Sequence, residues 1–188
     1  MPGMQSLMGK LLIAMPGIGD PRFEKSVVLL CVHTPEAAMG VVLNKPRNSV
    51  TIADVLGQLG IESARPLPTR PVLEGGPVKP DRGFVLHSAD YGARGSTQDV
   101  APGVRLTATR DVLDALAADE SPAEYQLALG YAGWGPGQLE SELSANVWLV
   151  GEPQHAIVFG AAHKTKWVDA IRDIGFDPAQ LSGQTGTA

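Results

Sequence analysis

Two apolar runs joined by a short polar connection constrain the fold of this chain more than any other part of its sequence. Ser26 to His33 and Met39 to Asn44 are nearly continuous in valine, leucine and other apolar residues, and Thr34 to Ala38 separates them. A connection this short favours an antiparallel hairpin. Because neither run alternates strictly between apolar and polar residues, we expect both faces of these strands to be covered.

The remaining pattern predicts more strands than helices. Further strands are predicted at residues 10–15, 72–77, 82–87, 104–108, 125–132, 146–150 and 156–160. Helices are predicted after the capping residues Thr51 and Thr109, from Thr165 onward, and around Leu139 and Leu143. Residues 65–71 are expected to form an extended loop, and residues 88–103 a long loop or irregular hairpin. Clustered hairpins with about four helices indicate an α+β fold with a mixed, largely antiparallel sheet.

Composition places the chain among ordinary globular proteins. Its 188 residues, 44% hydrophobic and 19% charged, fit a single domain, which we expect to span residues 1–181 with a frayed tail at 182–188. The 22 glycines and 15 prolines predict a turn-rich fold. A net charge of −5 argues against electrostatic capture of nucleic acid or an anionic membrane. We expect a monomer or a weak homodimer.

A single cysteine, Cys31, lies inside the first apolar run. It excludes an intrachain disulfide and any zinc site that needs two thiolates, and its apolar neighbours predict a buried core thiol. The apolar stretch from Leu11 to Met15 is too short for the core of a signal peptide, and no window approaches 18 consecutive apolar residues. These features predict a cytoplasmic protein that does not enter a membrane.

The segment Gly133-Trp-Gly-Pro-Gly137, which precedes a predicted helix, is the most suggestive local feature. Glycine-rich loops at helix starts often hold anions, but this one has neither the Lys-Ser/Thr of a P-loop nor the G-x-G-x-x-G spacing. We expect a structural corner in which the glycines supply positive φ or close backbone approach and Pro136 suits the first helical turn. A ligand loop closed by Trp134 is the alternative.

Other candidate groups have weaker local patterns. Glu74-Gly-Gly-Pro77 is typical of a bulge or turn, although Glu74 is a candidate site carboxylate. The four histidines have no spacing typical of a metal site, so each is predicted to be structural or exposed. The sequence has no G-x-S-x-G motif for a hydrolase nucleophile. We therefore predict no metal and no cofactor.

Several of these motifs together resemble the YqgE/AlgH family of small bacterial proteins. They are Gly9-Lys-Leu-Leu-Ile-Ala-Met-Pro16, Phe23 with Ser26-Val-Val28, Gly40-Val-Val-Leu-Asn-Lys-Pro46, Glu74-Gly-Gly-Pro-Val78, Leu86-His87, Gly130-Tyr-Ala-Gly-Trp-Gly-Pro-Gly-Gln-Leu-Glu140, Asn146-Val-Trp148, Trp167 and Gly175-Phe-Asp-Pro178. The resemblance covers nearly the whole chain in order. It implies one α+β domain with its sheet curled into a pseudo-barrel, but no established activity. Members are often labelled transcriptional regulators, yet no helix here carries the run of Lys and Arg that direct DNA binding requires.

Two functions from different classes remain open. The first is a non-catalytic binding or regulatory module that acts through a protein partner or a small ligand. Its predicted site consists of the polar and glycine positions at strand ends: Asn44, Lys45, Glu74, Gly75, Gly76, Tyr131, Trp134, Gln138 and Glu142. The second is an unrecognised hydrolytic enzyme with Glu74 or Glu142 as its base.

Overall fold

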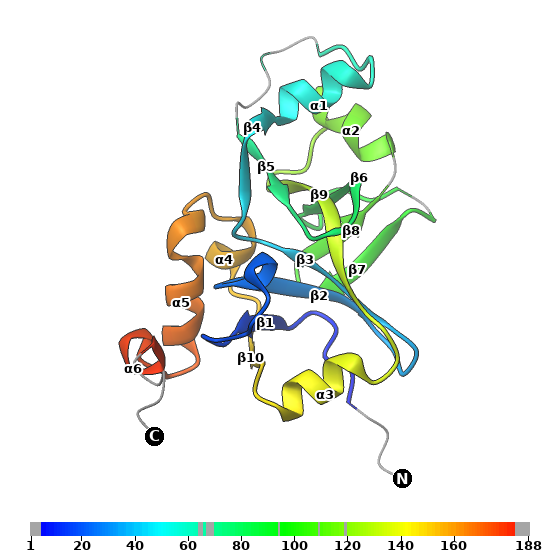
Figure 1. The fold of residues 1–188 in the computed structure, drawn as a ribbon. Coiled ribbons are helices and arrows are strands. Elements are labelled where there is room, and N and C mark those ends of the chain that lie inside the picture. Colours follow the sequence, from blue (N-terminus) through cyan, green and yellow to red (C-terminus); the bar gives the residue numbers. More distant parts are fainter. Residues whose placement is uncertain are drawn as a thin grey trace.

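The structure of the protein is a computed structural model that describes residues 5–63, 66, 70–93, 95–108, 110–118 and 120–182 (Figure 1). The strands are β1 (Leu11–Ala14), β2 (Val27–His33), β3 (Ala38–Val42), β4 (Pro46–Thr51), β5 (Pro71–Glu74), β6 (Val78–His87), β7 (Thr97–Ala101), β8 (Val104–Thr107), β9 (Tyr125–Trp134) and β10 (Trp148–Gly151). The helices are α1 (Ile52–Gln58), α2 (Arg110–Ala117), α3 (Gln138–Ser144), α4 (His155–Phe159), α5 (Lys166–Asp173) and α6 (Pro178–Ser182), with 3₁₀ turns η1 (Pro21–Phe23) and η2 (His163–Thr165).

The strands form one curled sheet with β9 near its middle. Its order is β10-β1-β2-β3-β9-β6-β8-β7, and β5 adds to it by pairing with both β4 and β9. All pairs are antiparallel except β5 with β9, so the expected mixed, largely antiparallel sheet is confirmed. The curl brings β7, at one edge of the sheet, close to β2. Gln98 on β7 donates a hydrogen bond to the Cys31 carbonyl on β2 at 3.0 Å.

Helices cover the sheet at three places. In Figure 1, α1 and α2 lie side by side at one end of the molecule, α3 lies at the opposite end, and α5 flanks β1 and β2. The described part of the chain thus has six α-helices, two more than expected from the sequence, and none of these is long and apolar enough to cross a membrane.

The central strands are buried on both faces, as the apolar runs predict. On β1, Leu11 and Ile13 pack into a cluster with α4 and α5, while Leu12 and Ala14 pack into another with α3 and β10. The same alternation continues along β2 and β3. Cys31 is fully buried in the first cluster, and burial raises the pKa of its thiol to about 12. The prediction of a buried core thiol is therefore confirmed.

A close crossing of backbones joins the two halves of the sheet. Gly75, just after β5, donates from its N–H to the Leu129 carbonyl of β9 and accepts from the Val42 N–H of β3. A Cβ on Gly75 would lie 2.3 Å from the Gly130 carbonyl oxygen, and one on Gly76 would lie 2.1 Å from the Tyr131 carbonyl carbon. Only glycine permits this approach, so Gly75 and Gly76 have a structural role that their sequence pattern does not reveal.

The structure differs from the sequence-based expectations in four segments. Residues 156–160 were predicted as a strand but lie mostly in helix α4, where Ile157, Val158 and Phe159 are buried in the core. A short apolar run does not distinguish a buried strand from a buried helix. Strand β4 was not predicted because its residues are mostly polar; it pairs with β5. Residues 88–103 contain β7, and the short helix α6 was not predicted.

The capping prediction at Thr51 is confirmed. Its hydroxyl accepts from the Asp54 N–H at 3.2 Å, and the Asp54 carboxylate accepts from the Thr51 N–H at 2.9 Å. The predicted cap at Thr109 lies outside the described residues, as do residues 65 and 67–69 of the predicted loop. Of the predicted tail, the first residue ends α6 and residues 183–188 lie outside the described part.

Helix α5 buries a charged residue in the core. Lys166 is 2% exposed, and its ammonium group donates to the Leu43 carbonyl at 3.0 Å. Burial lowers the pKa of Lys166 from its ordinary 10.5 to about 8. The folded protein therefore carries a destabilising charge below pH 8, which it loses at lower pH than the unfolded chain does.

We predict that the unfolding free energy of the wild-type protein rises between pH 8 and 10.5 relative to that of the Lys166→Met variant. The rise should reach about 3 kcal/mol, since one pKa unit corresponds to about 1.4 kcal/mol. Urea denaturation of both proteins across this range measures the difference. If the unfolding free energies of the two proteins changed in parallel with pH, the claim that the charge of Lys166 is buried would be contradicted.

Candidate functional site

The predicted site residues gather around two adjoining hollows. The first, the Lys45 hollow, has a volume of about 280 Å³ and is lined by Pro21, Arg22, Val42, Lys45, Glu74, Gly76 and Pro77. The second, the Glu142 hollow, has a volume of about 370 Å³ and is lined by Ile18, Asp20, Arg22, Phe23, Pro77, Val78, Gly133, Trp134, Gln138, Glu142, Val147 and Trp148. Both hollows share Arg22 and Pro77, so these two residues form the ridge between them.

The loop between β1 and β2 forms one wall of both hollows. Asp20 caps η1 by accepting from the Arg22 N–H at 3.0 Å, and its carboxylate also accepts from the Arg22 guanidinium at 2.8 Å. Asn44 accepts from the Val27 N–H at 2.9 Å and donates to the Lys25 carbonyl at 2.7 Å. Asn44 therefore fixes the end of this loop and lines neither hollow.

In the Lys45 hollow, the charged groups already have partners. The Lys45 ammonium donates to the Glu24 carbonyl at 2.5 Å. The Glu74 side chain is 58% exposed, and its carboxylate lies 3.5 Å from the Arg47 guanidinium. Such an exposed pair contributes little to stability. Gly76 forms part of the floor because its backbone crosses β9.

The Glu142 hollow combines aromatic rings with a carboxylate. Trp134 at the end of β9 is 5% exposed, and its ring packs edge to face on Trp148 with centroids 5.9 Å apart. Phe23 also packs edge to face on Trp148, with the two ring centroids 5.9 Å apart. The Trp148 indole N–H donates to Glu142 Oε1 at 3.4 Å. Glu142 Oε2 is buried and has no hydrogen-bond partner in the described part of the chain.

The loop from Gly133 to Gly137 only partly matches its predicted role. Gly133 lies in β9 and Gly135 has open space around its Cβ position, so neither needs to be glycine for the reasons expected. Gly137 alone has a positive φ, of 72°, as the N-cap of α3. Pro136 precedes this cap rather than occupying the first turn. Gln138 closes the corner by accepting from the Gly135 N–H at 3.0 Å.

The predicted site is thus brought together in part. Lys45, Glu74 and Gly76 meet in one hollow, and Trp134, Gln138 and Glu142 in the other. Tyr131 lines neither, because its ring packs edge to face on Phe84 at 5.7 Å. Sequence reasoning missed several other lining residues, among them Arg22, Phe23, Pro77 and Trp148. Phe23 and Trp148 belong to motifs noted above, but only the fold shows that they meet.

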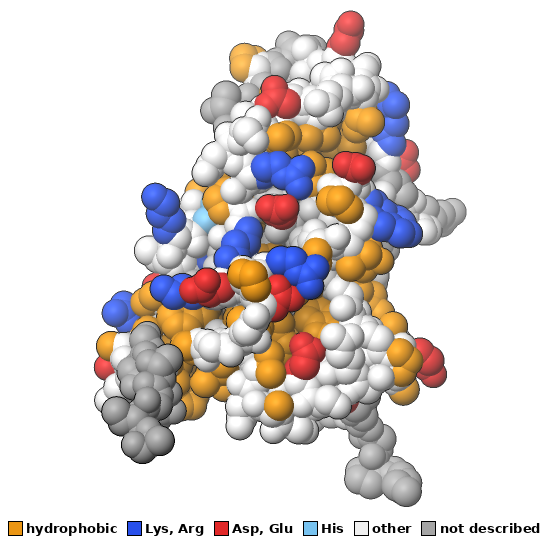
Figure 2. All heavy atoms as spheres, in the orientation of Figure 1, with side chains coloured by type: hydrophobic (Ala, Val, Ile, Leu, Met, Phe, Trp, Pro, Cys, Tyr) orange, Lys and Arg blue, Asp and Glu red, His pale blue; other side chains and the backbone are white. Residues whose placement is uncertain are grey.

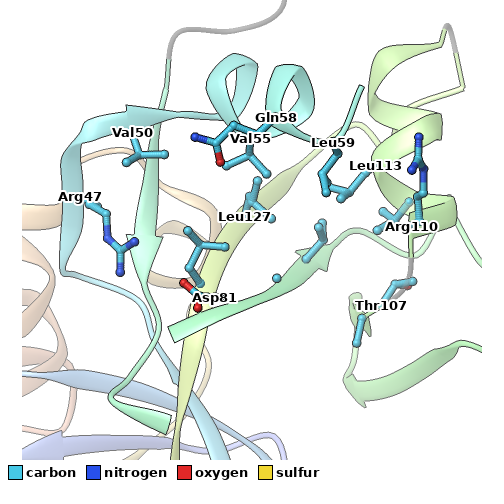
Figure 3. Close-up of a pocket in the computed structure, with 15 residues that line it drawn as sticks. Arg47, Val50, Val55, Gln58, Leu59, Asp81, Thr107, Arg110, Leu113 and Leu127 are labelled. Atoms are coloured by element: carbon cyan, nitrogen blue, oxygen red, sulfur yellow. The ribbon is translucent and has the colours of Figure 1, made fainter. Parts of the chain in front are cut away.

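A larger cleft lies between α1 and α2 (Figure 3). Its volume is about 590 Å³, and Leu127 on β9 lies on its apolar floor. Val55 of α1 and Leu59, the C-cap of this helix, line it. Leu59 is 44% exposed. None of the nine predicted site residues lines this cleft.

Each histidine has its own structural partner or environment. His33 Nδ1 accepts a hydrogen bond from the Leu7 N–H, so the ring hydrogen lies on Nε2, which donates to the Glu140 carboxylate at 2.7 Å. His87 bonds Thr107 at 2.7 Å, and burial lowers its pKa. Burial, then the charge of Lys166, lowers the pKa of His163 to about 4. Among the described residues, no three His, Cys, Asp or Glu side chains gather as metal ligands do.

Comparison with known proteins identifies the family. The model of the AlgH-like family, DUF179, matches residues 11–179. A UPF0301 protein from Caulobacter vibrioides is 49% identical over 183 residues, which cover 97% of this chain and 94% of that protein. A UPF0301 protein from Ruegeria pomeroyi is 48% identical over 97% of this chain and 99% of its own length. The chain belongs to the AlgH-like family, as its motifs predict.

Two solved structures share the fold. The solution structure of AlgH from Pseudomonas aeruginosa is 37% identical, with a TM-score of 0.78 over 98% of this chain and all of that one. The crystal structure of a Corynebacterium diphtheriae protein is 20% identical, with a TM-score of 0.75 over 100% of this chain and 95% of that one. The α+β fold predicted from the sequence is confirmed by these similarities, which assign no activity.

We predict that Trp134→Ala lowers the unfolding free energy by about 3–5 kcal/mol, because it leaves a cavity beside Trp148 and Leu139 in a buried cluster. Gln138→Ala is the matched control in the same corner and should cost about 1 kcal/mol through one lost hydrogen bond. Chemical denaturation measures both. A loss below about 1 kcal/mol for Trp134→Ala would show that this ring has no core role.

Proposed function

We propose that the protein is a non-catalytic binding module whose site comprises the Lys45 hollow and the Glu142 hollow. The observation that carries the proposal is their adjacency: segments far apart in the sequence meet around one ridge, Arg22 and Pro77. Sites commonly form where loops at strand ends converge on a rigid sheet. A small ligand could occupy one hollow, whereas a segment of a protein partner could extend across the ridge into both.

The chemistry of the two carboxylates favours binding over hydrolysis. Glu74 is exposed and paired with Arg47, an ordinary surface arrangement for a carboxylate. Among the described residues, the Trp148 indole is the one group that hydrogen-bonds the Glu142 carboxylate, at 3.4 Å. A hydrolytic base also needs donors placed beside it for the developing oxyanion, and the cation of this lining, Arg22, is paired with Asp20.

Charge and cysteine usage complete the proposal. Figure 2 shows acidic and basic side chains interspersed on one face of the molecule, which suits partners other than nucleic acid. A chain with a single buried thiol requires no oxidising compartment for folding. We therefore propose that the protein acts in the cytoplasm.

A fragment titration followed by ¹H–¹⁵N NMR tests the proposed site. The probes are small amines, carboxylates, phosphates and neutral aromatic molecules. We predict that the binders shift backbone signals around the two hollows and lose affinity in Gly133→Leu. Gly133 lines the Glu142 hollow, and the nearest heavy atom to its Cβ position is 3.4 Å away, so a larger side chain can extend there from β9.

Gly135→Leu is the matched control, because Gly135 lies two residues away, has open space and lines neither hollow. This variant should bind the fragments as the wild type does. Shifts confined to the cleft between α1 and α2, or equal binding by both leucine variants, would place the site elsewhere.

A further inference from the structure

The Glu142 hollow contains a buried carboxylate oxygen without a hydrogen bond. Glu142 Oε1 accepts from the Trp148 indole N–H at 3.4 Å, a long hydrogen bond, and Oε2 has no partner among the described residues. Burying an unpaired acceptor of a carboxylate costs more free energy than burying a neutral one. Because Oε2 has almost no accessible surface, a ligand that donates an N–H to it must first displace the side chains that cover it, and the hydrogen bond would then remove this cost.

Three aromatic rings line the same hollow as this carboxylate. Phe23, Trp134 and Trp148 all line the hollow, and the interplanar angles of the two packed ring pairs are 75° and 76°. Neither pair is stacked face to face. The faces of aromatic rings carry partial negative charge and attract cations, most strongly at tryptophan. Rings and carboxylate therefore favour the same kind of ligand.

The cation present in the lining, Arg22, lies over the Phe23 ring, with its guanidinium carbon 5.8 Å from the ring centroid, and is paired with Asp20. Arg22 donates to the Asp20 carboxylate from Nε and from a terminal nitrogen, the latter at 2.8 Å, on the ridge side of the hollow. Asp20, Glu142 and Arg22 are the charged residues of the lining, which leaves one net negative charge. That remaining charge belongs to Glu142.

We propose that the Glu142 hollow binds a protonated amine or a guanidinium group that donates a hydrogen bond to Glu142 Oε2 and lies against the rings of Phe23, Trp134 and Trp148. This inference rests on the proposed function and names the ligand class of that site. The hollow, at about 370 Å³, is at the small end of ligand pockets, which span roughly 300–1,000 Å³. It therefore suits one alkylammonium or guanidinium head group.

The hydrogen bond distinguishes this site from one that recognises charge alone. A quaternary ammonium has the same charge as a primary ammonium and interacts with aromatic faces, but it has no N–H to donate. Butylammonium and butylguanidinium should thus bind more tightly than butyltrimethylammonium. Butanol, which is neutral, should bind weakest.

The experiment is an NMR titration of the full chain with these four probes, repeated on Glu142→Gln. The glutamine retains an acceptor oxygen for the Trp148 indole and loses the charge. We predict that it weakens butylammonium binding about tenfold or more, the loss expected for one charge-assisted hydrogen bond. Binding of butanol should not change.

A second variant keeps the proposal testable if Glu142→Gln does not fold. Phe23→Leu removes one ring from the hollow and leaves the carboxylate in place, and we predict a severalfold loss for the ammonium and guanidinium probes. Gly135→Leu is again the control that should bind like the wild type. The melting temperature of each variant verifies that it is folded.

A free amine and a basic side chain of a protein would present the same group. Acetyl-Ala-Lys-Ala-amide and acetyl-Ala-Arg-Ala-amide separate these sources. If a partner protein supplies the cation, the peptides should bind more tightly than the butyl probes and should also shift signals around the Lys45 hollow. If the ligand is a free amine, the butyl probes should bind at least as tightly and shift the Glu142 hollow alone.

Equal binding of butylammonium by the wild type and Glu142→Gln would overturn the inference, and so would equal binding of butylammonium and butanol. If another fragment class binds the hollows and is blocked by Gly133→Leu, the proposed function stands and the cation inference fails. If no fragment of any class binds, both fail.

Discussion

The architecture depends on one backbone contact, the crossing of Gly75 and Gly76 over β9. This crossing connects three strands at once, because Gly75 bonds β9 through Leu129 and β3 through Val42. Any side chain at Gly76 would collide with the backbone of Tyr131, at 2.1 Å from its carbonyl carbon. On one side of this point β9 pairs with β3, and on the other with β5 and β6, so the sheet can curl instead of splitting into two.

The curl determines where the candidate site lies. The carboxyl end of β9 continues from the crossing to Trp134 and the corner that begins α3. The segment after the crossing begins with Pro77, which forms the ridge with Arg22. The two hollows therefore lie beside the crossing, on backbone fixed by sheet hydrogen bonds. A site supported in this way loses little conformational entropy when a ligand binds.

The sequence predicted the central fold well because its strands are buried on both faces. The continuous apolar runs of β2 and β3 allowed no other placement, and the capping box at Thr51 defined the start of α1. Prediction failed where the local pattern carries too little information. The polar strand β4 has no apolar periodicity, and Ile157 to Phe159 would suit a buried strand as well as a buried helix.

The candidate site was predictable only as a set of polar and glycine positions. Trp134 and Glu142 were selected from the glycine-rich corner, but Phe23 and Trp148 reach the same hollow from distant segments. Gly75 and Gly76 also permit the close backbone crossing, and Asn44 fixes the end of the β1–β2 loop, roles that their sequence patterns do not reveal. Contacts between segments that are far apart in the chain follow from the sheet topology, which no local motif encodes.

The indole N–H signals of the three tryptophans provide the most direct measurement of the central claim, that a cation binds beside Glu142. Trp148 donates to Glu142 and Trp134 lines the same hollow, whereas Trp167 donates to the Ala14 carbonyl at 2.8 Å in the core. During titration with butylammonium, the signals of Trp148 and Trp134 should move and saturate together while that of Trp167 stays in place. Equal shifts of all three, or no shift of Trp148, would contradict the account.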